Sequence, residues 1–184
     1  MKNFVRKDLL FSLCGLNCYL CPMYNDKYCP GCGGGLGNQS CMIAKCSLEK
    51  GNFQYCYTCQ HFPCERYSHI DDYDSFITHQ HRNKDIELVR KIGIEKYHTI
   101  LKKKADYLKL LLEDYNSGRE KTFFSLAMNL LDLEDIETVM MQLQNKEIIT
   151  KTVKEKSKLA VKLFQEIAQQ KNIELRLRRK PKVK

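Results

Sequence analysis

The sequence contains no tryptophan, only four prolines and no hydrophobic run long enough to cross a membrane. A membrane-spanning helix needs roughly 20 predominantly apolar residues, whereas the longest apolar run near the N-terminus is Leu9-Leu10-Phe11. That run is also too short for the core of a signal peptide. We therefore expect a cytoplasmic protein that does not enter a membrane.

Cysteine is absent from the last 120 residues, because all ten cysteines lie between Cys14 and Cys64. Disulfides are rare in a reducing compartment, so such a cluster indicates metal binding or thiol chemistry. Seven of the nine glycines and three of the four prolines fall in the same segment, where they interrupt regular secondary structure. Large apolar residues are sparse there. We expect a Cys-rich module over residues 1–70, stabilised by metal that supplies roughly 10–16 kcal/mol of apparent binding free energy per structural zinc.

The spacing of the cysteines includes three C-x2-C pairs, each able to turn two sulfurs toward one ion. In Cys29-Pro30-Gly31-Cys32 the glycine permits the positive φ that a zinc knuckle needs. Because tetrahedral zinc takes four ligands, eight cysteines satisfy two sites and leave two over, with the pairing undecided. His61 is an alternative ligand. We predict two or more zinc ions, with the candidate ligands Cys14, Cys18, Cys21, Cys29, Cys32, Cys41, Cys46, Cys56, Cys59 and Cys64.

An iron–sulfur cluster is the alternative cofactor. The opening Cys14-x3-Cys18-x2-Cys21 matches the three-cysteine loop of radical-SAM enzymes, but those enzymes need alternating strands and helices that this sequence does not predict. Cys21-Pro22 is a step that also occurs in ferredoxins. The chain would then be an iron–sulfur redox protein or an accessory to an oxidoreductase, and metal-free thiol chemistry is a third interpretation.

Several segments of the cysteine region resemble an uncharacterised prokaryotic family of unknown function. Its members open with C-G-L-[D/N]-C-x2-C and close with C-x2-C-x2-[F/Y]-P-C. Here the opening is Cys14-Gly15-Leu16-Asn17-Cys18-Tyr19-Leu20-Cys21, and Cys56, Cys59 and Phe62-Pro63-Cys64 form the close. The resemblance covers about residues 12–67 and implies a metal-binding domain without an established activity. Where many members have a further C-x2-C-x4-C run, this chain has Asn38 at its first position.

The rest of the chain predicts a helical bundle over residues 84–172, so the fold class is mainly α. Apolar residues recur at three- and four-residue steps from residue 84 to 115, the period of a helix, and Gly93 interrupts them. We expect further helices over residues 123–131, 132–143 and from about 152 to 167. Asp132 to Asp135 would place carboxylates at a helix N-terminus.

Positive charge is concentrated at the C-terminal end. The formal net charge is +9, and residues 150–184 hold twelve Lys or Arg against three Asp or Glu, so the residues before them sum to zero. Residues 173–184 form a basic tail that is either a solubilising terminus or a contact for RNA or an acidic partner, because such a run binds phosphate backbones. Its alternating residues 173–178 also allow a short strand. The candidate contacts are Arg176, Arg178, Arg179, Lys180, Lys182 and Lys184.

No set of residues has the spacing of a Ser-His-Asp or Cys-His catalytic site. His79 and His81 lie in a polar stretch and are weak metal candidates. The sequence favours a non-enzymatic module in which structural zinc fixes a surface for an unknown protein partner or RNA. Labile metal, for sensing or delivery, remains a further possibility.

Overall fold

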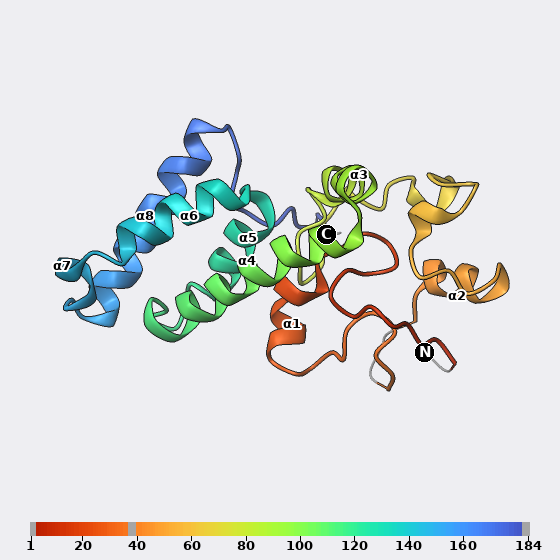
Figure 1. Ribbon diagram of the computed structural model, residues 1–184, viewed down its shortest axis with the longest axis horizontal. Helices are drawn as coiled ribbons and strands as arrows, with labels where there is room; N and C mark the ends of the chain where they lie inside the picture. Colours follow the sequence, from red (N-terminus) through yellow and green to blue (C-terminus); the bar gives the residue numbers. More distant parts are fainter. Residues whose placement is uncertain (1–2, 37–39, 182–184) are drawn as a thin grey trace. The chain divides into compact units, whose positions relative to one another are not determined.

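The structure, a computed structural model, describes residues 3–36 and 40–181 (Figure 1). These residues form α-helices and short 3-10 turns but no strand, apart from an isolated antiparallel bridge between Val5 and Gly34. The mainly α prediction is confirmed, and the strand considered for residues 173–178 is absent. The elements in order are η1 (Cys18–Leu20), α1 (Pro22–Asn25), α2 (Met42–Glu49), η2 (Cys56–Thr58), η3 (Glu65–Tyr67), α3 (Arg82–Ile92), α4 (Ile94–Asp114), α5 (Lys121–Leu130), α6 (Leu133–Leu143), α7 (Lys146–Ile149) and α8 (Val153–Gln170).

The helix boundaries follow local residue chemistry. Gly93 separates α3 from α4 at a φ of 85°, which L-residues rarely adopt, and its N–H closes α3 on the carbonyl of Val89. At the start of α8, Thr152 and Glu155 form a capping box in which each side chain accepts the other's backbone N–H. The predicted interruption at residue 93 and the helix starting near residue 152 are therefore confirmed.

The chain divides into two compact units. Unit 1 comprises Met1–Leu101 with Arg178–Lys184, and unit 2 comprises Lys102–Leu177. The sequence predicted a division between residues 70 and 84 instead, and a separate tail from residue 173. The observed division lies further along the chain because α3 and the first turns of α4 supply core side chains to the Cys-rich segment.

The core of unit 1 shows this dependence in three contacts. The ring of Phe11, which is fully buried, meets the ring of Tyr97 at a centroid separation of 5.2 Å. Asn17 bridges the same region, because its amide donates to Asp85 at 2.9 Å and its carbonyl accepts from the Tyr97 hydroxyl at 2.8 Å. A Cys-rich segment with few large apolar residues thereby obtains a core from helices outside it.

Unit 2 is built mainly from α5, α6 and α8, which pack against one another. Phe124 and Phe164 are fully buried and meet edge to face. The segment after α8 turns back onto α5, where Leu177 packs with Leu126 and Leu130. Residues 173–177 therefore belong to a hydrophobic core, which corrects the prediction that they begin a free tail.

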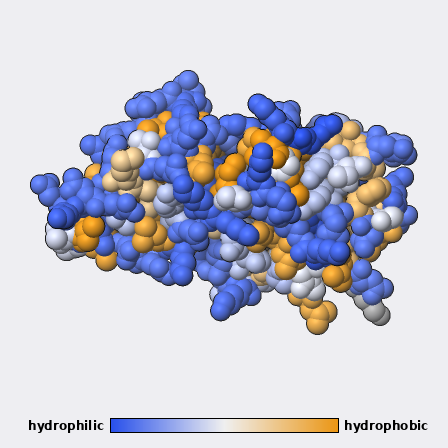
Figure 2. Space-filling model, viewed as in Figure 1, coloured by the Kyte–Doolittle hydropathy of each residue, from blue (hydrophilic) through white to orange (hydrophobic). Residues whose placement is uncertain are grey.

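No helix among the described residues is long and apolar enough to cross a membrane. On the face drawn in Figure 2, most of the surface is hydrophilic and the apolar side chains form several separate groups. The most exposed large apolar residues, Leu36 and Tyr28, both belong to the Cys-rich segment.

Candidate metal centre

The ten cysteines are free thiols, all half-buried except Cys41, which is exposed. They fall into two groups with different surroundings. We call Cys18, Cys21, Cys29 and Cys32 the first thiol group, and Cys46, Cys56, Cys59 and Cys64 the second thiol group. Each group combines cysteines from two or more separate segments of the chain.

Short turns position the first thiol group. The 3-10 turn η1 closes when the N–H of Cys21 donates to the carbonyl of Cys18 at 3.0 Å, and α1 follows directly after Cys21. Gly31 has a φ of 84°, which lets the chain turn tightly between Cys29 and Cys32. These are the local conformations that the two C-x2-C spacings predicted.

Backbone N–H groups point at the sulfurs of the first group. The Cys21 sulfur accepts from the N–H groups of Tyr24 and Met23, and the Cys18 sulfur accepts from the N–H of Cys32. These hydrogen bonds favour thiolates, which are the form that binds metal. The backbone therefore supplies donors to two sulfurs of this group.

Burial opposes ionisation of the same thiols. It raises the pKa of Cys18 well above its ordinary value, and the neighbouring thiols of Cys32, Cys14 and Cys21 add to the rise. Burial likewise raises the pKa of Cys32 to about 11, against the charge of Arg6, which lowers it. Several thiolates this close together repel one another, so only a cation among them makes the ionised set favourable.

The second thiol group lines a single small cavity. Cys46 in α2, Cys56 in η2, and Cys59 and Cys64 in the following loop all contribute to the wall of a cavity of about 30 Å³. The volume exceeds the roughly 10–15 Å³ that a single water molecule needs. Burial raises the pKa of Cys56 to about 11, and the thiols of Cys14, Cys64 and Cys46 contribute. Four cysteines from three segments thus line one small space.

Cys14 and Cys41 lie outside the C-x2-C pairs of the first group and outside the cavity of the second, although both interact electrostatically with Cys32. Cys14 interacts electrostatically with Cys18 and Cys32 of the first group and with Cys56 of the second, and its sulfur lies 3.3 Å from the Ser12 hydroxyl. Cys41 precedes α2 and interacts with Cys32. Eight grouped thiols and two others agree with the count that two four-ligand sites require.

Arg6 fixes the loops around Cys32. Its buried guanidinium donates to three main-chain carbonyls: Gln54 at 2.9 Å, Cys32 at 3.0 Å and Phe11 at 2.9 Å. The sequence motifs do not include this residue, because nothing in the sequence marks a lone arginine as buried. One side chain thereby joins three loops of the Cys-rich segment.

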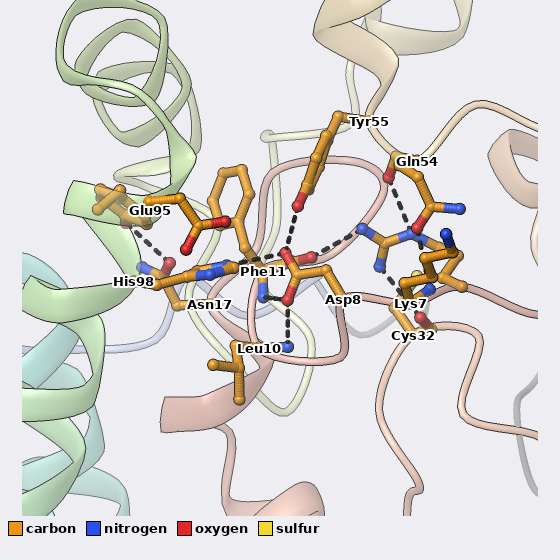
Figure 3. A network of polar contacts seen from close by, with 12 residues as sticks. Lys7, Asp8, Leu10, Phe11, Asn17, Cys32, Gln54, Tyr55, Glu95 and His98 are labelled. Atoms are coloured by element: carbon orange, nitrogen blue, oxygen red, sulfur yellow. Dashed lines mark hydrogen bonds and ion pairs between the residues drawn. The ribbon is translucent and has the colours of Figure 1, made fainter.

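Asp8 is the second organiser of this region (Figure 3). Its Oδ1 accepts the N–H of Leu10 at 2.9 Å, while its Oδ2 accepts the Tyr55 hydroxyl at 2.8 Å and lies 2.9 Å from Nε2 of His98. Burial and the adjacent Asp8 carboxylate raise the pKa of Tyr55, which therefore stays a hydrogen-bond donor. Asp8 thus connects the N-terminal loop, the loop before η2 and α4.

The histidine candidates occupy different settings. His61 is exposed and lines an open pocket together with Cys46, Cys59 and Cys64, so it lies beside the second thiol group. His79 uses both ring nitrogens locally, at 3.0 Å from the Ile70 carbonyl and 3.0 Å from the Ser75 hydroxyl. Its role is to hold the loop before α3. His81 is the residue that precedes α3 and has polar contacts of its own.

The basic residues of the C-terminal segment are only partly available to a partner. All four described basic residues are exposed, but Arg178 pairs with Asp74 and Arg176 lies 3.9 Å from Glu174, whereas Arg179 and Lys180 are the candidates left for a partner. The predicted contacts Lys182 and Lys184 lie outside the described residues.

Within residues 3–36 and 40–181, no three His, Cys, Asp or Glu side chains are arranged as a ligand set that could hold a metal ion. The first thiol group is therefore defined by its two C-x2-C turns and the second by a shared cavity wall, not by a completed coordination shell. Comparison of the chain with family models, with curated proteins and with solved structures finds no match.

Proposed function

We propose that this chain is a metal-binding module in which each thiol group binds one structural zinc ion and the folded unit serves as a binding surface for another molecule. The observation that carries the proposal is the shared cavity of Cys46, Cys56, Cys59 and Cys64. Four thiolates with no position left for substrate make a structural site, since catalytic zinc keeps an open position.

The donor chemistry supports zinc in both groups. Thiolates suit zinc and iron–sulfur clusters, and the tight turns with backbone N–H donors to sulfur suit either. The Cys29-Pro30-Gly31-Cys32 turn favours zinc, because this short knuckle delivers two sulfurs to a single ion. When bound, the ion would neutralise repulsion among thiols that burial otherwise keeps protonated.

Metal and acid-labile sulfide analysis of protein purified anaerobically, with its absorption spectrum, tests this proposal. We expect two zinc ions per chain, no sulfide and no visible colour. If the protein contains iron and acid-labile sulfide, the iron–sulfur hypothesis is correct and the zinc hypothesis is wrong. A folded protein without metal would overturn metal binding altogether.

Single substitutions test the division into groups. Cys21→Ser in the first group and Cys59→Ser in the second should each lower the content to one zinc per chain after a chelator wash. Cys41→Ser is the matched control, because Cys41 is exposed and lies outside both groups. Two zinc ions retained in Cys59→Ser would contradict the proposed second site.

For the binding surface, the exposed Arg179 and Lys180 suit contact with a phosphate backbone such as RNA. The double variant Arg179→Gln/Lys180→Gln should weaken binding to a labelled RNA and reduce its salt dependence, with zinc content unchanged. Equal RNA affinity and equal salt dependence would exclude this segment as the contact and leave a protein partner.

A further inference from the structure

Arg82 is a buried arginine whose charge the described contacts satisfy only in part. Its side chain is 1% exposed, and its stem runs beneath Gly15, next in sequence to Cys14. Nε lies 3.2 Å from Oδ1 of Asp71 as an ion pair, but neither Nε nor Nη1 has a hydrogen-bond partner among the described residues. A buried guanidinium with an unused donor is costly, so an anion is expected within its reach.

Tyr67 presents a second buried donor in the same place. Its hydroxyl has no nitrogen or oxygen partner among the described residues, and it faces the sulfur of Cys56. The hydroxyl also interacts electrostatically with Cys14 and with Arg82. The ring is held edge to face against Phe62 at a centroid separation of 4.9 Å. Tyr67 therefore lies beside the second thiol group, and Arg82 is close enough to the Tyr67 hydroxyl to interact with it electrostatically.

The charge of the proposed centre explains these two donors. A divalent ion held by four thiolates carries a net charge of −2, and a dianion beside an apolar cavity needs compensating charge and hydrogen bonds to its sulfurs. The ion pair with Asp71 runs through Nε without a hydrogen bond, so Nε and Nη1 both have donor capacity that the described residues do not use. The guanidinium of Arg82 and the hydroxyl of Tyr67 are the kinds of donor that the sulfurs of a metal tetrathiolate would require.

We propose that Arg82 and Tyr67 are the outer donors of the second thiol group and compensate the negative charge of its metal–thiolate centre. This inference rests on the proposed metal function and assigns residues outside every cysteine motif. Both are positioning residues, since they act on the metal through the sulfurs of Cys56 and its neighbours. A donor of this kind changes metal affinity by roughly 10–100-fold when it is removed.

The test uses the full-length protein titrated with zinc, and with cobalt as a coloured probe, in competition with a chelator. Arg82→Gln should lower the affinity of one of the two sites by roughly 10–100-fold, with a smaller loss in Arg82→Lys. Tyr67→Phe should shift the sulfur-to-cobalt charge-transfer band. Arg90→Gln, exposed on the same helix, is the matched control and should change neither quantity.

Urea unfolding with and without metal separates this role from simple packing. The outer-donor role predicts that Arg82→Gln lowers the urea midpoint more in metal-loaded protein than in metal-free protein. If Arg82→Gln lowers the urea midpoint equally in metal-loaded and metal-free protein, Arg82 acts only through its pair with Asp71. That result would overturn the inference. Suppose that wild type binds metal and that the Arg82 and Tyr67 variants keep its metal affinity and its charge-transfer band position. That result would also overturn the inference, but the proposed function would stand. A wild type that binds no metal would overturn both.

Discussion

Asp74 and Arg178 bind each other through both main chain and side chain, although 104 positions separate them in the sequence. The Arg178 N–H donates to Oδ2 of Asp74 at 2.8 Å, and the Asp74 N–H donates to the Arg178 carbonyl at 2.8 Å. The guanidinium lies 3.4 Å from Oδ1 of the same carboxylate. This pair fixes the basic C-terminal segment onto the loop before α3, so the charge run is an anchored part of unit 1 over its described residues.

Asp74→Ala should release this segment. The substitution removes the acceptor for Arg178 and for the N–H of His79, which donates to Oδ1 at 2.7 Å. Because an unanchored segment rich in arginine is open to trypsin, we expect cleavage after Arg178 or Arg179 to become several-fold faster in limited digestion. Asp72→Ala is the control, since Asp72 is exposed and its side chain pairs with the exposed His69. Equal cleavage rates in both variants would contradict the anchor.

The same carboxylate predicts a pH dependence. Burial alone would raise the pKa of Asp74, but the backbone N–H groups of His79 and Arg178 and the Arg178 guanidinium hold this pKa below its ordinary value of 3.8. A lowered pKa in the folded state gives stability that is fully present above the unfolded value and is lost as the pH falls through the folded value. The difference in urea midpoint between wild type and Asp74→Ala should therefore be constant above about pH 5 and shrink below pH 3.8.

Arg6→Gln should destabilise unit 1 strongly. The change deletes most of a donor set that joins three carbonyls, those of Phe11, Cys32 and Gln54. Leaving buried carbonyls unpaired costs about 1–3 kcal/mol each, although such losses are not additive, so we expect a total of about 2–4 kcal/mol in urea unfolding. Lys7→Gln, exposed at the next position, should change stability by less than about 0.5 kcal/mol.

Asp8 and Tyr55 should be energetically coupled. Their hydrogen bond of 2.8 Å is half-buried and shares Oδ2 of Asp8 with His98. A double-mutant cycle of Asp8→Asn and Tyr55→Phe should give a coupling free energy of about 0.5–3 kcal/mol in urea unfolding, because the two residues belong to one network. Tyr57→Phe is the control: its ring stacks on that of Tyr55, and among the described residues the change removes no hydrogen bond to Asp8. Additive losses from the Asp8 and Tyr55 variants would show that the network is not cooperative.

Gly15→Ala should be among the most damaging substitutions outside the cysteines. A Cβ at this position would lie 2.6 Å from Cδ1 of Ile86, and the backbone φ is 94°. Overpacking and an unfavourable φ together predict a loss of about 2–4 kcal/mol. Gly51→Ala isolates the backbone contribution, because its φ is 110° and no atom lies within 4 Å of a Cβ there, so we expect about 1–2 kcal/mol. Similar losses at the two positions would contradict the close packing of Ile86 on the cysteine loop.

The sequence determined the features that depend on neighbouring residues. Helical periodicity and the stop at Gly93 predicted elements that the structure confirms, because each is decided within a few residues of chain. The C-x2-C spacings likewise predicted tight turns, which η1 and η2 form. Metal binding, the identity of the metal and the partner stay proposals that the experiments above address.

Only the tertiary structure decided which distant residues meet. The chemistry of Arg6, Asp8 and Arg82 carries no mark in the sequence, since burial of a charged side chain depends on loops and helices up to 90 positions away. Tertiary contacts also decided the position of the C-terminal segment. Its charge predicted a free tail, but Ile173, Leu175 and Leu177 pack in a hydrophobic core and Arg178 is bound by Asp74. Local periodicity specifies the helices. Which polar side chains are buried depends on which helices and loops pack together, because only that packing supplies the hydrogen-bond partners that a buried polar group needs.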